Sequence, residues 1–166
     1  KAINYSKGPT VGPTNDCAIC NAIAADQCPD VIEIDAASNT GVDDVRQIIE
    51  NARYAPMQAR YKVFIIDEVH MLSKSAFNAL LKTLEEPPGH VVFMLATTEI
   101  RKVPVTILSR CQRFDLRRVD IPTLVEHYKK IAAAEKIAID DEAVQIIARA
   151  ADGSVRDGLS LLDQAI

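Results

Sequence analysis

Two unbroken apolar runs limit the folds that this chain can adopt. Residues 63–66 are β-branched or aromatic and lead into Asp67 and Glu68, and residues 91–96 form a second run. Apolar runs without alternation are typical of strands that are buried on both faces of a parallel sheet. A helical pattern separates the two runs, as the crossover between parallel strands requires. We therefore expect an α/β domain built on a parallel sheet.

Further elements are expected around these runs. Ser73 should cap a helix that has its leucines on one side and ends before two adjacent prolines. An earlier helix opens at Asp43, where the helix dipole favours acidic side chains. Residues 31–34 are a strand candidate. Residues 6–15 are rich in glycine and proline and should form a loop.

The last third of the chain carries only helical patterns. They cover about residues 122–136 and 140–150, and a third pattern begins near Arg156. We expect the α/β domain to occupy residues 1–119 and an all-helical domain to occupy residues 120–166.

The composition excludes several classes of protein. A hydrophobic content of 48% with 25% charged residues is that of a globular protein, not of a disordered tail or a disulfide scaffold. No run of 18 apolar residues and no secretory leader occurs, so a cytoplasmic location is expected. The net charge of −4 argues against independent DNA binding, and any nucleic-acid contact should be local or shared with other chains.

The acidic pair at the end of the first apolar run suggests chemistry. A buried strand that delivers Asp67 and Glu68 at its end resembles the Walker B element of nucleotide hydrolases. The alternative is that strand ends are often acidic because they emerge into solvent. His70 completes a DExH pattern known from helicases, but those enzymes need two recA-like domains, which 166 residues cannot supply.

Other residues could contact a nucleotide. Thr97 and Thr98 end the second apolar run, which suits a polar group that reaches toward a γ-phosphate, although such residues are common where strands turn. Arg110 lies in a Ser-Arg-Cys motif, and Arg156 lies at the start of the last helical pattern. An isolated arginine is usually a solvated surface charge. Each signal is weak alone, and the information lies in the order of the motifs along the chain.

That ordered set resembles the gamma/tau family of AAA+ clamp-loader ATPases of bacterial DNA polymerase III. The matching stretches are DAAS at 35–38, DEVHML at 67–72, FNALLKTLEEPP at 77–88, ATT at 96–98, ILSRC at 107–111 and GSVRD at 153–157. The twelve-residue stretch is highly specific, whereas apolar residues followed by Asp-Glu are shared by many nucleotide hydrolases. The resemblance covers essentially the whole chain and implies an AAA+ parallel-sheet domain followed by a helical lid.

The resemblance implies roles for residues at the strand ends. Asp67 would be the Walker B acid that holds Mg²⁺, and Glu68 would be the catalytic base. Thr98, or less directly Thr97, would be the first sensor of the nucleotide.

The resemblance also implies an assembly. Arg156 would be a second sensor, carried by the lid, and Arg110 would be an arginine finger that acts in trans on ATP held by a neighbouring subunit. The implied function is that of a clamp-loader subunit that uses ATP and Mg²⁺ to load the sliding clamp onto primed DNA during replication. Its partners would be further gamma/tau copies, the delta and delta-prime subunits, the sliding clamp, the polymerase III core and primed DNA.

One family motif does not occur in these residues. The sequence has no GxxxxGK[ST] pattern, whose backbone N–H groups cradle phosphates. In the family this P-loop lies just upstream of a helix whose tail resembles residues 1–5. We therefore expect the P-loop, with the first strand of the sheet, to precede Lys1. The intact protein would be an ATPase, and residues 1–166 alone should bind ATP weakly and be inactive.

The cysteines leave two interpretations open for a loop at about residues 5–28. Without a leader peptide, the CxxC of Cys17 and Cys20 points to metal or redox chemistry more than to a disulfide. The family carries a zinc module, and its four cysteines align with Tyr5, Thr14, Cys17 and Cys20. Cys28 could supply a third ligand, but a closed zinc site needs four. The loop is therefore either an incomplete zinc site or a remnant with free thiols.

Two other identities also stay open. A non-hydrolysing subunit of the delta-prime type would donate only its arginine finger. The missing P-loop favours that identity, and the intact pair of Asp67 and Glu68 argues against it, because such a subunit has no need of both acids. Alternatively, the chain is the inert product of a truncated gene, and it would then fail to assemble with clamp-loader partners.

Overall fold

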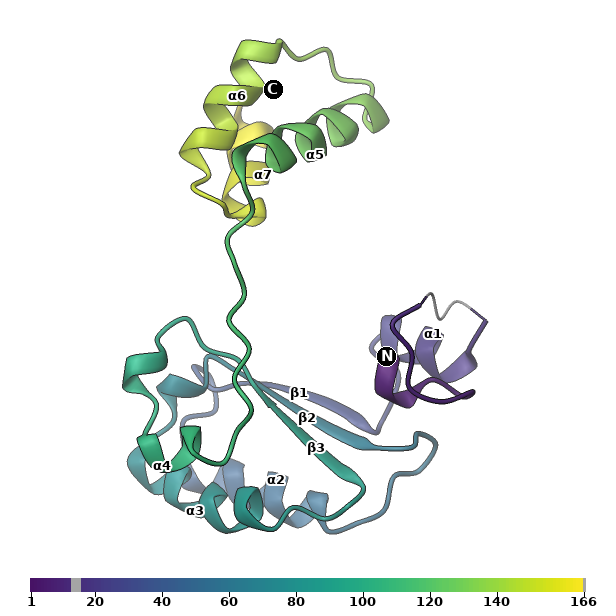
Figure 1. Cartoon of the computed structure of the whole chain (residues 1–166), viewed down its shortest axis with the longest axis vertical. Coiled ribbons are helices and arrows are strands. Elements are labelled where there is room, and N and C mark those ends of the chain that lie inside the picture. Colours follow the sequence, from purple (N-terminus) through teal and green to yellow (C-terminus); the bar gives the residue numbers. More distant parts are fainter. Residues whose placement is uncertain (13–15, 166) are drawn as a thin grey trace. The chain divides into compact units, whose positions relative to one another are not determined.

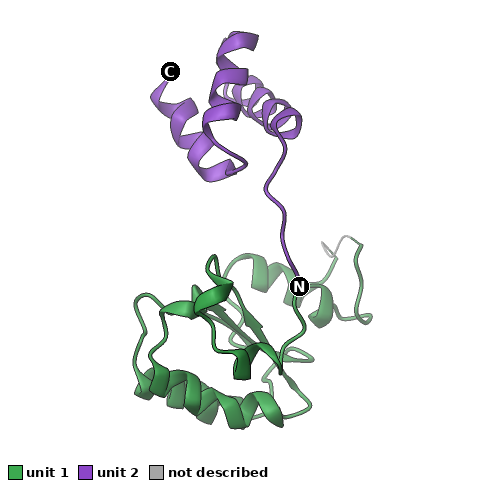
Figure 2. Cartoon of the chain, turned by 60° about the vertical axis from the view of Figure 1, so that its left-hand side comes forward, with its two compact units in different colours: residues 1–113 green, residues 114–166 purple. Residues whose placement is uncertain are grey.

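The computed structural model describes residues 1–12 and 16–165. Residues 13–15 of the expected loop, which include the aligned position Thr14, lie outside the described residues, and so does Ile166. The chain divides into two compact units, residues 1–113 and residues 114–166 (Figure 2).

A three-stranded sheet forms the centre of the first unit. The strands are β1 (Val31–Asp35), β2 (Lys62–Asp67) and β3 (Val91–Leu95), in that spatial order. Both neighbouring pairs are parallel, with Ile34 opposite Ile66 and Ile66 opposite Leu95. The apolar runs therefore form the strands that the sequence predicts, and the parallel sheet is confirmed.

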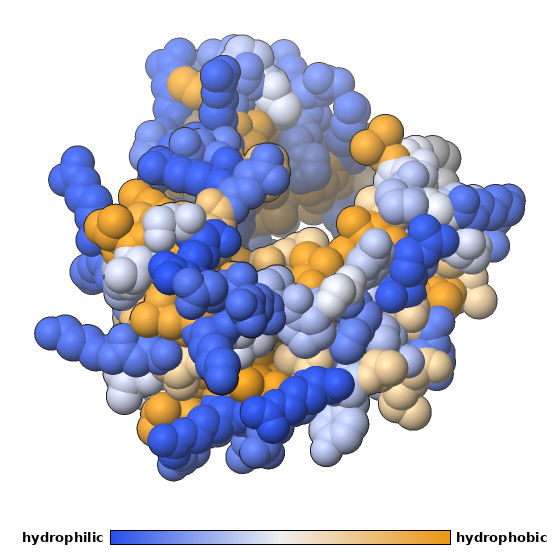
Figure 3. All heavy atoms as spheres, turned by 60° about the horizontal axis from the view of Figure 1, so that its bottom comes forward, coloured by the Kyte–Doolittle hydropathy of each residue, from blue (hydrophilic) through white to orange (hydrophobic). Residues whose placement is uncertain are grey.

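Two helices lie along one face of this sheet, α2 (Val42–Ala52) and α3 (Lys74–Glu85) (Figure 1). Ser73 caps α3 as expected, because its Oγ accepts a hydrogen bond from the N–H of Ala76 at 3.2 Å. The core between helices and sheet contains Phe64, whose ring stacks on that of Phe93 with centroids 5.4 Å apart. In Figure 3 the side of the unit that carries α2 and α3 comes forward, and it shows mainly hydrophilic residues with hydrophobic residues between them.

The expectation of strands buried on both faces is met by β2 better than by β3. Val63, Phe64 and Ile66 of β2 are each at most 4% exposed. Met94 of β3, on the face turned away from α2 and α3, is 44% exposed. The difference arises because β2 has a neighbour on each side, whereas β3 is an edge strand of the described sheet.

Short elements complete the first unit: the 3₁₀ turns η1 (Ala2–Asn4), η2 (Val69–Met71) and η3 (Ile100–Lys102), and the helices α1 (Ala18–Ala24) and α4 (Val105–Leu108). The start of the chain is a single 3₁₀ turn in place of the expected helix tail. Its Asn4 is only 2% exposed, and its amide donates to the Tyr61 carbonyl at 2.9 Å and accepts from the Tyr61 N–H at 2.8 Å. This double hydrogen bond anchors the N-terminal segment beside β2.

The second unit consists of α5 (Ile121–Ala134), α6 (Asp141–Ala150) and α7 (Val155–Gln164), close to the three helical patterns of the sequence. Each begins at a side-chain cap, from Asp120, Asp140 and Ser154 respectively. Tyr128 and Leu124 of α5 are fully buried in the core of this unit. In the described part of the chain, no helix combines the length and the apolar character that a membrane span requires.

Candidate functional site

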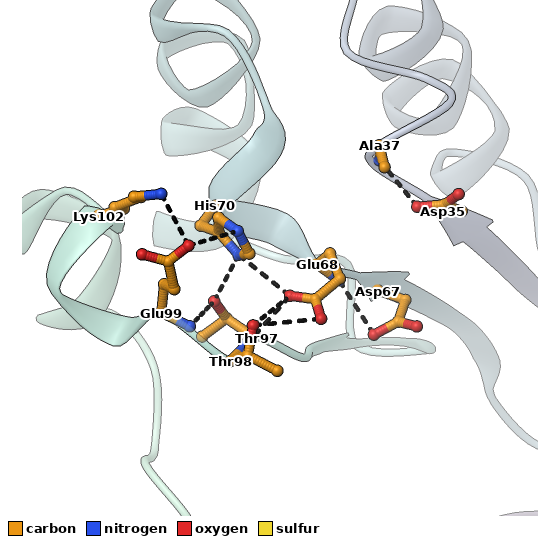
Figure 4. Close-up of polar contacts among 9 residues, drawn as sticks. All are labelled: Asp35, Ala37, Asp67, Glu68, His70, Thr97, Thr98, Glu99 and Lys102. Atoms are coloured by element: carbon orange, nitrogen blue, oxygen red, sulfur yellow. Dashed lines mark hydrogen bonds and ion pairs between the residues drawn. The ribbon is translucent and has the colours of Figure 1, made fainter. Parts of the chain in front are cut away.

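The carboxyl ends of the strands bring the expected acids and threonines to one edge of the sheet, namely Asp67, Glu68, Thr97 and Thr98 (Figure 4). Asp35 and Asp67 are partners in the register of β1 and β2. The N–H of Ala36 donates to the Asp67 carbonyl and that of Ala96 to the Ile66 carbonyl, both at 2.9 Å, so the ladder continues past the strands. In parallel α/β sheets, ligands bind outside this edge.

Glu68 stands at the turn that follows β2 and has a strained backbone. Its φ of 46° is left-handed, which costs a residue with a side chain roughly 1–2 kcal/mol. The turn is supported locally, because the Glu68 N–H donates to Oδ1 of Asp67 at 3.0 Å. Strain of this kind concentrates at functional sites. At this left-handed turn the carboxylates of Asp67 and Glu68 point in different directions, as Figure 4 shows.

The Glu68 carboxylate binds Thr98. Its Oε2 accepts the Thr98 hydroxyl at 3.0 Å and the Thr98 N–H at 3.2 Å, and Oε1 lies 3.2 Å from the same hydroxyl. The neighbouring hydroxyl, that of Thr97, instead contacts His70 at 2.9 Å and accepts the N–H of Glu99 at 3.0 Å. The two threonines thus have different partners, since of their two hydroxyls it is that of Thr98 that contacts Glu68.

His70 is a member of this cluster that sequence reasoning missed. Its side chain is 7% exposed, and Nδ1 lies 3.1 Å from Oε2 of Glu68 while Nε2 lies 3.5 Å from Oε1 of Glu99. Lys102 binds the same Glu99 oxygen at 2.7 Å, and that hydrogen bond lowers the pKa of Glu99. The sequence signal for His70 was its place at the end of the DExH pattern, two positions after Glu68, and that pattern does not reveal its burial.

The two aspartates at this edge differ in what they can bind. Asp35 uses both carboxylate oxygens on its own turn, accepting the Ala37 N–H and the Ser38 hydroxyl, each at 2.8 Å. Asp67 is exposed at the end of β2. An exposed carboxylate is the kind of oxygen ligand that Mg²⁺ prefers, so Asp67 is the aspartate at this edge that fits a magnesium ligand.

Neither of the two arginines has a described contact with this cluster. Arg110, just after α4, donates to the Thr106 carbonyl at 2.8 Å and to Oε1 of Glu85 at 3.1 Å. Arg156 is exposed in the first turn of α7 and belongs to the second unit.

The cysteines do not form a metal centre among the residues described. Cys17 caps α1, and its Sγ accepts the Cys20 N–H at 3.4 Å; both side chains are 1% exposed. Burial raises the pKa of the Cys17 thiol, but hydrogen bonds from Cys20 and Ser6 outweigh burial and lower it to about 7. No group of three or more ligating side chains comes together within residues 1–12 and 16–165. These residues therefore do not fit a closed zinc site, which needs four ligands.

Family models match both parts of the chain. Residues 1–120 match the family described as "DNA polymerase III, delta subunit". Residues 123–166 match the family described as "DNA polymerase III clamp loader subunit, ATPase lid domain".

Similar curated proteins align over the whole chain. It is 56% identical over 166 residues to the DNA polymerase III subunit tau of Bacillus subtilis and 52% identical to that of Escherichia coli. Both alignments cover 100% of this chain but only 30% and 26% of the relatives. The chain thus spans about a quarter to a third of the length of these two proteins.

Solved structures agree on the fold. A gamma-subunit-related protein of DNA polymerase III from Thermotoga maritima is 29% identical, with a TM-score of 0.54 over 71% of this chain and 42% of that chain. The RuvB Holliday junction branch migration motor of the same organism reaches a TM-score of 0.65 over 84% of this chain and 46% of that chain, at 22% identity. The second likeness concerns the fold alone. Taken together with the family models and the curated relatives, these matches show that the chain belongs to the gamma/tau family of DNA polymerase III clamp-loader subunits.

Proposed function

We propose that this chain contains the hydrolytic edge of an ATP-driven clamp-loader subunit, which acts when bacterial DNA polymerase III loads its sliding clamp onto primed DNA. The observation that carries the proposal is the contact between Glu68 and Thr98 beside Asp67. Three groups from two adjacent strand ends thereby face the place where a nucleotide binds in sheets of this type.

In the proposed reaction Asp67 and Glu68 have different roles. Asp67 would hold Mg²⁺, which neutralises charge that develops on the phosphates during phosphoryl transfer. Glu68 would orient the attacking water, and Thr98 would link that carboxylate to the γ-phosphate. Thr98 is preferred over Thr97 as the sensor because its hydroxyl contacts Glu68, whereas that of Thr97 contacts His70.

The two arginines would supply positive charge to the γ-phosphate from outside the strand ends. Arg156 would approach the nucleotide from the helical lid, and Arg110 would reach the ATP of a neighbouring subunit. Phosphoryl transfer needs cations around the γ-phosphate, and a cation supplied in trans makes hydrolysis depend on assembly.

The implied partners are those of the clamp loader: further gamma/tau copies, the delta and delta-prime subunits, the sliding clamp, the polymerase III core and primed DNA. A net charge of −4 suits a chain that meets DNA only as part of such an assembly. Replication complexes of this kind work in the cytoplasm, which is therefore the proposed location.

The test is a chimera in which these 166 residues replace the matching segment of the Bacillus subtilis tau subunit, 56% identical to them. The chimera should hydrolyse ATP in the presence of Mg²⁺. The Glu68→Gln variant keeps the size of the side chain, so it should abolish hydrolysis and spare ATP binding, measured with a fluorescent nucleotide. Glu33→Gln, an exposed glutamate of β1, is the matched control and should leave hydrolysis unchanged.

Two results would count against the proposal. Turnover of Glu68→Gln at the parent rate would remove Glu68 from the reaction. A chimera that joins clamp-loader subunits and supports hydrolysis by its neighbours, but hydrolyses no ATP itself, would identify the delta-prime type of subunit instead.

A further inference from the structure

The buried ring of His70 lies at the centre of the site, yet the proposed reaction gives it no task. Its side chain is 7% exposed and touches three other side chains (Figure 4). Nδ1 lies 3.1 Å from Glu68 and 2.9 Å from Thr97, and Nε2 lies 3.5 Å from Glu99. The ring therefore joins the turn after β2 to the turn after β3.

Glu68 needs such a partner if it is to act on water in one orientation. A glutamate has three rotatable side-chain bonds, and fixing them costs conformational entropy. Glu68 is 33% exposed, so packing alone does not hold its carboxylate. The described contacts that do so come from Thr98 on one side and His70 on the other.

The far side of the ring is itself held in place. Oε1 of Glu99 faces Nε2 and is bound by Lys102 at 2.7 Å, while the Glu99 N–H donates to the Thr97 hydroxyl at 3.0 Å. A reacting group, a partner that orients it and a third group that orients the partner form an arrangement that recurs in activated sites.

We infer that His70 is a positioning residue that orients the Glu68 carboxylate toward water, with Glu99 fixing the ring. The inference rests on the proposed function, because it assigns a task only if Glu68 acts in hydrolysis. It predicts a specific loss in the rate of hydrolysis, not in nucleotide binding. A histidine that only filled the core would instead affect stability.

The experiment uses the same chimera and compares three variants of one side chain. Asparagine places its side-chain amide near the position of Nδ1, whereas glutamine places its amide near the position of Nε2. His70→Ala should lower kcat about 10-fold to 100-fold, the effect of misplacing a catalytic group by about an ångström. The Kd for a fluorescent ATP analogue should stay within about twofold, because binding is not the step affected. His70→Asn should recover most of the lost kcat, and His70→Gln should not.

Controls separate this inference from the proposed function. His90→Ala removes a half-buried histidine whose ring contacts the Ala52 carbonyl at 3.2 Å, and it should leave kcat unchanged. If the parent chimera is active and Glu68→Gln is not, but His70→Ala retains the parent kcat, the inference fails alone. If His70→Ala does not fold, the comparison of His70→Asn with His70→Gln tests the inference instead. Equal kcat values for Asn and Gln at equal melting temperatures would then overturn the inference.

Discussion

Glu85 binds Arg110 across 25 residues of sequence, with 3.1 Å between Oε1 and the guanidinium nitrogen Nη2. The pair joins the end of α3 to the turn after α4, and a second guanidinium nitrogen donates to the Thr106 carbonyl. In these contacts the arginine touches neither Glu68 nor Asp67. It is thus held by contacts within its own unit, while its side chain remains 30% exposed.

The first prediction follows from that position. Arg110→Ala should leave slow ATP hydrolysis by an isolated chimeric subunit unchanged and lower hydrolysis by the assembled clamp loader. An arginine finger contributes about 10³-fold or more to phosphoryl transfer, so the loss in the assembly should approach that size. Steady-state hydrolysis with and without partner subunits measures it. Arg53→Ala, an exposed arginine after α2, should have no effect in either state. An equal loss in isolated subunits would contradict action in trans.

The second prediction concerns a buried carboxylate that sequence reasoning did not single out. Asp30 is 0% exposed and accepts the N–H groups of Met57, Gln58 and Ala59 at 2.7–2.8 Å. Burial raises the pKa of Asp30, but these three donors and the charge of Lys62 outweigh burial and hold the pKa below its usual range. Asp30→Asn places an amide group against backbone donors and should lower the free energy of unfolding at pH 7 by about 1–3 kcal/mol.

The pH dependence of that loss has a defined sign. Because the folded-state pKa of Asp30 is depressed, its stabilisation is complete above the unfolded-state pKa of about 3.9 and is lost as the pH falls through the folded-state value. The difference in unfolding free energy between the parent and Asp30→Asn should therefore be constant from pH 7 to about pH 5 and shrink at lower pH. Urea unfolding followed by circular dichroism measures it, and Asp26→Asn, at an exposed turn, is the control. A constant difference down to pH 2 would argue against an ionised Asp30.

The third prediction tests the packing of the second unit. A Cβ atom on Gly158 of α7 would lie 1.8 Å from the Tyr128 hydroxyl oxygen and 2.4 Å from its ring carbon Cζ. Alanine is the better helix former by about 1 kcal/mol, yet the overpacking should dominate. Gly158→Ala should lower the stability of this unit by about 1–3 kcal/mol, visible as a lower thermal unfolding midpoint. Ser160→Ala, on an exposed position of the same helix, should be neutral or slightly stabilising. A stabilised Gly158→Ala variant would contradict the packing of Tyr128 against α7.

The fourth prediction concerns metal removal. Cys17 and Cys20 come together without further ligating side chains from the described residues, so zinc should add no folding energy of the kind that closed sites supply. Incubation with EDTA should leave the thermal unfolding midpoint unchanged, and metal analysis should find less than one zinc per chain. A lower midpoint after chelation, together with one bound zinc, would show that Cys17 and Cys20 recruit other ligands.

Much of the fold could be predicted because its signals are local. An apolar run of four residues favours a buried strand wherever it pairs, and Ser73 caps α3 through a bond to a residue three positions away. The acidic pair at the end of β2 and the threonines after β3 could also be grouped in advance. Both lie at the ends of parallel strands, and the carboxyl ends of parallel strands share an edge.

The remaining features depend on contacts between distant residues. The Asp30 carboxylate reaches donors 27–29 positions away, and the space beside Gly158 is filled by a tyrosine from another helix. Neither partner can be read from the neighbouring sequence. A buried aspartate and a helical glycine each look unfavourable until the fold supplies the groups that compensate them.

The sequence by itself thus determined the three strands, the long helices of both units, the Ser73 cap of α3 and the identity of the acids and threonines at the strand ends. The tertiary structure alone decided that Thr98 contacts Glu68, that Thr97 contacts His70, and that the histidine is buried between two carboxylates. The physical reason is the left-handed turn at Glu68. The turn sets the direction of the Glu68 side chain, but whether that side chain meets Thr98 depends on how β2 pairs with β3. This pairing is a property of the folded sheet.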